Sequence, residues 1–164
     1  MVWDKSGTTT LGSNSGTIDL TMLSTTFNTF MVHALQNGTL DSKMRFGVGG
    51  VDAGTNYASR QVANGGSDGT GTSGTEIDVG VGGYSHDSFH VGYFVNISGE
   101  EKLFIEWLVM RNTAGAGTAP MREEVAAKWV NTAAQADTIQ YLESGTGAAT
   151  DIATNSNLTV LGTD

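Results

Sequence analysis

The sequence predicts an all-β protein, an antiparallel β-sandwich for which a jelly roll is the expected form. Two observations carry this prediction: apolar residues alternate with polar ones in short segments, and turn-forming residues separate these segments every 8 to 12 residues or so, about the spacing of a sandwich. Glycine supplies 23 of the 164 residues, with one proline and no cysteine. We therefore expect about ten short strands, in a single domain that covers residues 1–164.

The strands of the first half follow from alternation or from short apolar runs bounded by Gly, Asn and Ser. They are expected at residues 8–11, 17–20, 27–35, 43–48, 57–62 and 76–79. The segments between them carry strong turn signals, such as Asn37-Gly38 and Asp68-Gly69. Glycine in this chain thus marks turns between strands.

The clearest strands form a hairpin between residues 88 and 110. Each has a row of alternating apolar residues: Phe89, Val91, Tyr93, Val95 and Ile97 in the first, and Leu103, Ile105, Trp107 and Val109 in the second. The short acidic loop 98–101 joins them, which predicts an antiparallel pair. We expect these two uniformly apolar rows to face the core.

Residues 120–129 fit both a helix and a strand. A proline at the start, acidic residues in the first turn and the four-residue spacing of Met121, Val125 and Trp129 are typical of a helix. As a strand, the segment would turn Val125, Ala127 and Trp129 to the core. The strand is favoured, because so short a helix is marginal and the surrounding chain is all β. Two further strands, at 138–142 and 158–161, complete the expected set.

The opposite face of the 88–110 hairpin is also partly apolar. It carries Phe94, Phe104, Leu108 and Met110, interrupted by Lys102 and Glu106. Such a face is either covered by another part of the same chain or forms a contact between subunits. Both alternatives stay open here. In the second, these four apolar residues are the candidate subunit interface of a homo-oligomer, with a trimer as one option.

The charge of the chain limits its partners. Seventeen acidic residues against eight basic ones give a net charge of −9. No basic surface is available to neutralise phosphates, so neither nucleic acid nor an anionic membrane is an expected partner. The sequence shows no apolar run approaching the roughly 18 residues of a membrane span and no secretory signal pattern at its N-terminus.

Patterns that suggest catalysis do not hold together. The segment Gly69 to Gly74 matches the dinucleotide fingerprint, but no helix is expected after it. His86 and His90 would stand about 13 Å apart on one strand, too far to share a metal ion. Neighbouring residues Ser85, His86 and Asp87 would point to opposite faces, unlike a catalytic triad. We assign no catalytic, cofactor or metal residue, and expect no enzyme activity.

Two weaker possibilities involve acidic residues. Asp52, Asp68, Asp87 and Asp151 lie in glycine-rich loops, where they suit either calcium or a turn, and the turn is favoured. Glu106 and Glu143 lie on expected strands and would act on a glycoside only if two carboxylates faced one groove. Nothing in the sequence places two carboxylates together in that way.

The order of several short motifs resembles a family of small β-sandwich structural proteins encoded by marine tailed phages and uncultivated viruses. The motifs are Trp3-Asp4-Lys5, Thr10-Leu11-Gly12, Met44-Arg45-Phe46, Gly54 to Arg60, Asn64 to Gly69, Glu101-Lys102-Leu103, Ala114 to Pro120 and Lys128 to Thr132. Residues 138–162 are similar to the closing strands of many phage structural proteins. The resemblance implies a virion component, decorating a capsid or attached to a tail, assembled in the host cytoplasm. It supplies no catalytic residues.

The leading hypothesis is therefore a non-enzymatic outer capsid decoration or cement protein, whose partners are the major capsid protein or neighbouring virion subunits. Its acidic charge suits an outer surface better than contact with packaged DNA. The alternative is a carbohydrate- or receptor-binding module of a phage tail or fibre. That alternative needs exposed aromatic residues, and its candidate glycan contacts are Trp3, Tyr57 and Tyr84.

Overall fold

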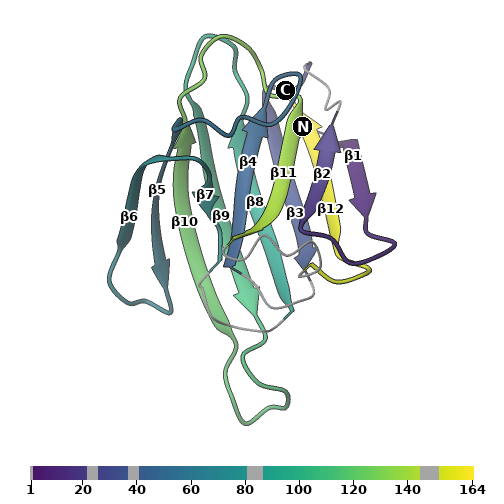
Figure 1. Ribbon diagram of the computed structural model, residues 1–164, viewed down its shortest axis with the longest axis vertical. Helices are drawn as coiled ribbons and strands as arrows, with labels where there is room; N and C mark the ends of the chain where they lie inside the picture. Colours follow the sequence, from purple (N-terminus) through teal and green to yellow (C-terminus); the bar gives the residue numbers. More distant parts are fainter. Residues whose placement is uncertain (1, 22–25, 37–40, 81–86, 145–151) are drawn as a thin grey trace.

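A computed structural model describes residues 2–21, 26–36, 41–80, 87–144 and 152–164 of the chain (Figure 1). Every regular element in these ranges is a β-strand, and the twelve strands form two antiparallel sheets. The expected fold class, an all-β sandwich, is confirmed. None of the described segments forms a helix long and apolar enough to cross a membrane.

The two sheets differ in width. The large sheet has eight strands, in the order β1 (Asp4–Thr10), β12 (Asn157–Thr163), β3 (Thr29–Gln36), β8 (Ser88–Val95), β9 (Lys102–Met110), β10 (Met121–Trp129), β5 (Tyr57–Ala63) and β6 (Gly69–Gly74). The small sheet has four, in the order β2 (Thr17–Thr21), β11 (Thr138–Ser144), β4 (Asp41–Gly47) and β7 (Ile77–Asp78). In Figure 1 the small sheet lies across only part of the large one, and the two ends of the chain lie close together.

The strand pairing is that of a jelly roll. A jelly roll pairs the first half of its eight strands with the second half in reverse order, as a folded antiparallel ribbon. Here β1 pairs with β12, β2 with β11, β3 with β8 and β4 with β7, all antiparallel. The remaining strands, β5, β6, β9 and β10, are insertions that widen the large sheet beyond β8.

Most strands lie where the sequence placed them. Residues 121–129 form β10, paired with β9 on one side and β5 on the other, so the strand interpretation of this segment is confirmed. The structure adds β6, which the sequence analysis did not include because its residues, Gly69–Gly74, contain no apolar side chain. This strand pairs with β5 at the edge of the large sheet.

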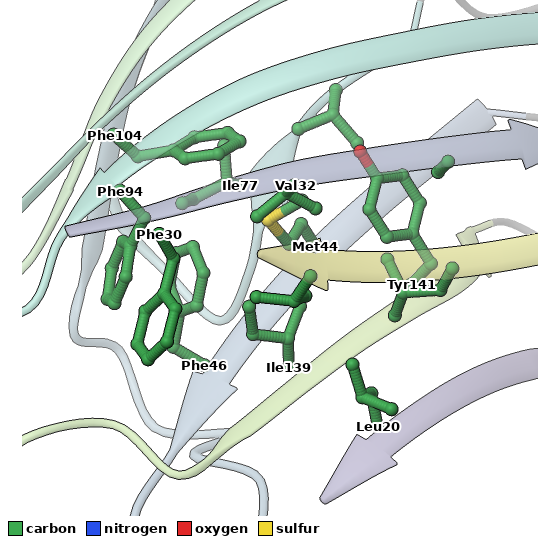
Figure 2. Packing of buried hydrophobic residues seen from close by; sticks show 14 of the residues in the cluster. Leu20, Phe30, Val32, Met44, Phe46, Ile77, Phe94, Phe104, Ile139 and Tyr141 are labelled. Carbon is green, nitrogen blue, oxygen red and sulfur yellow. The ribbon is translucent and has the colours of Figure 1, made fainter. Parts of the chain in front are cut away.

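Aromatic side chains fill much of the core between the two sheets (Figure 2). Phe46, from β4 of the small sheet, stacks on Phe94 of β8 with ring centroids 4.1 Å apart. It also meets Phe104 of β9 edge-on at 5.6 Å. Such offset and edge-on contacts are the preferred geometries of aromatic pairs, so they hold the two sheets in a defined relation.

The prediction of which hairpin face is buried was wrong. Strands β8 and β9 do pair as a hairpin, but the row from Phe89 to Val95 and the row from Leu103 to Val109 point away from the core. Their opposite face is buried instead. Its apolar members are only a few per cent exposed: Phe94, Phe104, Leu108 and Met110. Of the two alternatives left open for these four residues, burial within the monomer is the one observed, and they are not a subunit interface.

The polar side chains on the buried face of the hairpin are tolerated because each forms hydrogen bonds. Lys102 donates hydrogen bonds from Nζ to the carbonyls of Glu100 (2.7 Å) and Asn131 (3.0 Å). Burial of a polar group is costly only without such hydrogen bonds.

Gly92, on the same buried face, leaves room for the ring of Phe104, since a Cβ atom at Gly92 would lie 2.6 Å from Phe104 Cε2.

A cluster of hydrogen bonds around Asp52 anchors the connection between β4 and β5. The carboxylate of Asp52 accepts hydrogen bonds from Trp129 Nε1 (2.8 Å), Asn56 Nδ2 (2.9 Å) and the Gly54 amide (2.8 Å). Partial burial alone would raise the pKa of Asp52, but these three hydrogen bonds outweigh it and hold that pKa below its ordinary value. Asp52 is thus a turn former, as expected.

Replacing Asp52 by asparagine should make the free energy of unfolding depend less on pH in the acid range. A carboxyl with a lowered folded-state pKa stabilises the fold above its unfolded pKa of 3.8, and this contribution is lost as pH falls through the folded value. We expect Asp52→Asn to lower the free energy of unfolding by about 1 to 2 kcal/mol at neutral pH, because an amide cannot accept all three hydrogen bonds. The difference between the two proteins should shrink as pH falls below about 4 and close only below the folded-state pKa of Asp52.

Urea unfolding at several pH values measures this difference. The control is Asp4→Asn, at an exposed carboxyl at the start of β1. A constant gap between wild type and Asp52→Asn across the pH range would contradict the assignment.

Candidate docking surface

The face of the large sheet that points away from the small sheet is apolar across its centre. We call this the outer apolar face and define it by its residues on three strands: Leu35 of β3, Phe89, Val91 and Tyr93 of β8, and Leu103, Ile105, Trp107 and Val109 of β9. The exposed fractions are 46% for Phe89, 56% for Leu103 and 47% for Trp107. A contiguous exposed apolar patch of this kind marks an interaction site.

Strand register brings these side chains together in rows. Leu35, Phe89 and Val109 stand side by side across β3, β8 and β9. In the next rows Val91 lies opposite Trp107, and Tyr93 lies opposite Ile105. Because directly opposed residues on one sheet face lie about 5 Å apart, the rows form one continuous surface.

An aromatic group lies over one part of this surface. Trp3, which precedes β1, packs against Tyr93 with ring centroids 6.2 Å apart and an interplanar angle of 59°. Tyr93 in turn meets Trp107 edge-on at 6.4 Å and 77°. Trp3 is half-buried as a result. The three rings therefore lie close together but do not share a plane.

Shallow hollows adjoin the bulky residues. One lies between β9, β10 and β5 and is lined by Ile105, Trp107, Val62 and Ala126. A second, lined in part by Leu103, Ala58 and Ala126, continues from it. Charged side chains of β10 and β5, Arg60, Glu124 and Lys128, also line these hollows. The hollows give the face relief.

Ion pairs border the apolar residues on the β10 and β5 side and at the end of the hairpin next to Asp87. Four pairs lie at the margin of this face, with nitrogen to oxygen distances of 2.7 to 3.2 Å: Arg60 with Asp68, Lys128 with Glu101, Arg122 with Glu124 and Arg111 with Asp87. All eight partners are at least 43% exposed as side chains, so each pair contributes little to stability. Their effect is on charge: the margin of the face is neutral.

These four ion pairs contribute nothing to the net charge of the chain. The four marginal pairs use four of the eight basic residues and four of the seventeen acidic ones. The remaining four basic and thirteen acidic residues carry the whole formal charge of −9. A neutral apolar face on an otherwise acidic protein is a favourable place for another neutral surface to bind.

A polar network lies on the inner side of the same hairpin. His90 Nδ1 lies 2.5 Å from Glu106 Oε1, and His90 Nε2 lies 2.8 Å from the Ser88 hydroxyl oxygen. From the small sheet, the Tyr141 hydroxyl donates to both oxygens of Glu106, at 3.0 and 2.9 Å. Burial raises the pKa of Tyr141 well above its ordinary value, and the negative charge of Glu106 adds to that shift.

This network has the residue types of a nucleophilic relay but not its accessibility. The serine, histidine and glutamate are linked in the order that acyl transfer uses. However, Ser88 is 4% exposed, His90 and Glu106 are 1% exposed, and all three side chains point into the sandwich. Among the described residues, the arrangement links the two sheets and offers no opening to a substrate. No cluster of His, Asp and Glu suited to a metal ion occurs in the described part of the chain.

The sequence-predicted glycan contacts have three different outcomes. Trp3 lies at the surface beside Tyr93, as described above. Tyr57 is 1% exposed, so its assignment as a glycan contact was wrong. Its hydroxyl donates to the carbonyls of Phe46 (2.9 Å) and Asp52 (2.8 Å), and its ring stacks on Trp129. Tyr84 lies outside the described residues.

The structure also describes the loop aspartates, apart from Asp151, which lies outside the described residues. Asp68 and Asp87 pair with arginines, and Asp52 forms its turn. The residues of the outer apolar face on β8 and β9 were identified from the sequence, but as core, while Leu35 was placed only within an expected strand. The sequence analysis missed the pairing of His90 with Glu106. The signal for it was that each strand of the hairpin carries one of these polar residues in the row opposite its uniformly apolar row.

Comparisons with known proteins add little to this geometry. No protein-family model and no curated protein matches the chain. Among solved structures, the chain is similar to the CBM2 module of the evolved Dit of Lactobacillus casei BL23 phage J-1, with a TM-score of 0.23 and 10% sequence identity. The match covers 100% of this chain and 81% of that one. A likeness this low carries no argument about fold or function.

The hydrogen bonds from Tyr141 to Glu106 should contribute measurably to the free energy of unfolding. Replacing Tyr141 by phenylalanine removes the hydroxyl that donates to Glu106 and leaves a buried carboxylate with fewer donors. We expect a loss of about 1 to 3 kcal/mol in the free energy of unfolding. The matched control is Tyr93→Phe, on the outer apolar face, which should change stability by less than about 0.5 kcal/mol. Urea unfolding compares the two, and equal losses would argue against the network.

Proposed function

We propose that this chain is a non-enzymatic structural protein of a virion, an outer capsid decoration or cement protein that docks on neighbouring protein subunits. The resemblance of its motifs supports the virion setting. The observation that carries the docking role is the outer apolar face, where Phe89, Leu103 and Trp107 are each about half exposed. A cement protein acts through such contacts and needs no catalytic residues.

The chemistry of the face suits a protein partner. Burying apolar surface gives about 25 cal/mol per Å² of favourable free energy, and the outward side chains of β8 and β9 from Phe89 to Val109 are apolar or aromatic. A glycan needs polar groups beside its aromatic contacts, to hydrogen-bond its hydroxyls. Here the charged side chains of β10 and β5 are already joined in ion pairs, and His33 of β3 lies against Phe89 with ring centroids 6.3 Å apart.

A carbohydrate- or receptor-binding module remains the second candidate, because Trp3, Tyr93 and Trp107 gather on the same face. The angles of 59° and 77° between successive rings count against it. A sugar ring stacks on a flat aromatic surface, and these three rings do not offer a common one. A glycan array probed with the wild-type protein and with Tyr93→Ala tests this candidate.

An acidic residue in the face should prevent incorporation into particles. We expect Trp107→Asp to reduce binding to virus particles depleted of this protein by about tenfold or more, because a charge would be buried at the contact. The matched control is Val48→Asp: Val48 is 44% exposed, against 47% for Trp107, but lies after β4 of the small sheet.

Co-sedimentation with the particles measures binding, and thermal unfolding checks that each variant is folded. The variant Leu103→Lys, at a second exposed position of the face, tests whether the effect on binding is specific to Trp107. Wild-type binding by both Trp107→Asp and Leu103→Lys would overturn the proposed function.

A further inference from the structure

We propose that the occupant of the outer apolar face is a second copy of this chain, so that the protein forms a homo-oligomer through this face before it meets any other partner. This inference rests on the proposed function in one respect, since both require the outer apolar face to be a docking surface. It goes further by naming the partner. Area, charge and shape each support it.

The outer surface of the large sheet is wide enough for a stable contact. Eight strands spaced about 4.8 Å apart span roughly 34 Å, and a nine-residue strand such as β9 is about 30 Å long. The whole surface is therefore on the order of 1,000 Å², against about 800 Å² per partner in a stable interface. The outer apolar face is its central part, so a contact of that size would also cover ion pairs of the margin, such as Lys128 with Glu101. Two copies packed sheet to sheet, at the usual distance of about 10 Å, would bury its apolar centre.

The charge distribution favours self-association at this face over any other. Two chains of net charge −9 repel when their acidic surfaces approach. On the β10 and β5 side of the outer apolar face each basic residue already has an acidic partner, as in Arg60 with Asp68 and Lys128 with Glu101. Two copies can thus meet there without bringing their net charges together. A basic partner would instead be drawn to the acidic surfaces.

The relief of the face complements itself. Ile105 of β9 lies opposite Ala126 of β10, while Trp107 lies opposite Glu124. The hollow lined by Val62 and Ala126 lies beside Ile105 and Trp107. A second copy related by a two-fold axis can set its bulky side chains into this hollow of the first. Such isologous contacts are the commonest in homo-oligomers.

Sedimentation equilibrium over a wide range of protein concentration tests the proposal. The wild type should show at least twice the mass of one chain. The variants Trp107→Asp and Leu103→Lys should each associate at least about thirtyfold more weakly than the wild type. Val48→Asp, equally exposed but on the small-sheet side, should behave as wild type. Thermal unfolding of each variant confirms that it is folded.

A second measurement uses the absence of cysteine from the chain. A single cysteine at Val109, which is 43% exposed in the monomer, should react with a thiol reagent more slowly as protein concentration rises. A cysteine at Val48, which is 44% exposed, should react at a constant rate. This comparison reports on the face itself and does not depend on a disruptive substitution.

The outcomes separate the two proposals. A wild type that stays monomeric, or an oligomer that the face variants leave intact, would overturn the second copy as occupant. If Trp107→Asp still abolished particle binding in that case, the proposed function would stand with a different protein on the face. If the face variants changed neither oligomer nor particle binding, both proposals would fail.

Discussion

The buried contact between Glu106 and Tyr141 favours the observed orientation of the central hairpin. Glu106 of β9 lies between the sheets, where the Tyr141 hydroxyl of β11 donates to both of its oxygens and His90 of β8 contacts one of them. Turning the hairpin over would carry Glu106 and His90 to the surface and leave the Tyr141 hydroxyl buried without this acceptor. A buried polar group without a partner costs about 1 to 3 kcal/mol, more than the roughly 0.5 to 1.5 kcal/mol that a made hydrogen bond contributes. The network therefore favours the observed face, together with Phe94 and Phe104, which are part of the same core.

The same selection determines what the surface carries. Because side chains alternate along a strand, every residue between the buried ones points outward, and on β8 and β9 these are large and apolar. Each such side chain would contribute roughly 1.5 to 3 kcal/mol if fully buried. The isolated chain forgoes that contribution. On the proposal that a second copy covers the face, the contribution is recovered in the oligomer.

This explains where prediction from the sequence succeeded and where it failed. Period-two alternation located the strands at 88–95 and 102–110, because strand geometry depends on local pattern. It could not tell which row was buried, since the rule that the more apolar row faces the core assumes a monomer without partners. Tyr57 failed for a related reason: its hydroxyl is satisfied by the carbonyls of Phe46 and Asp52, a contact that only tertiary structure creates. Strand β6 was missed because pairing with β5, not its own side chains, makes it a strand.

The inserted strands give the fold its capacity to dock. Without β5, β6, β9 and β10, the large sheet would have the four strands β1, β12, β3 and β8, and would span only about 14 Å. With strands about 30 Å long, a face of that width is roughly 400 Å², about half of the 800 Å² per partner of a standard interface. The insertions roughly double the sheet, bring Leu103, Ile105 and Trp107 to its outer face, and supply the three ion pairs of β10 and β5 at its margin. The jelly roll thus provides the core, while the inserted strands provide much of the surface through which we propose that the protein assembles.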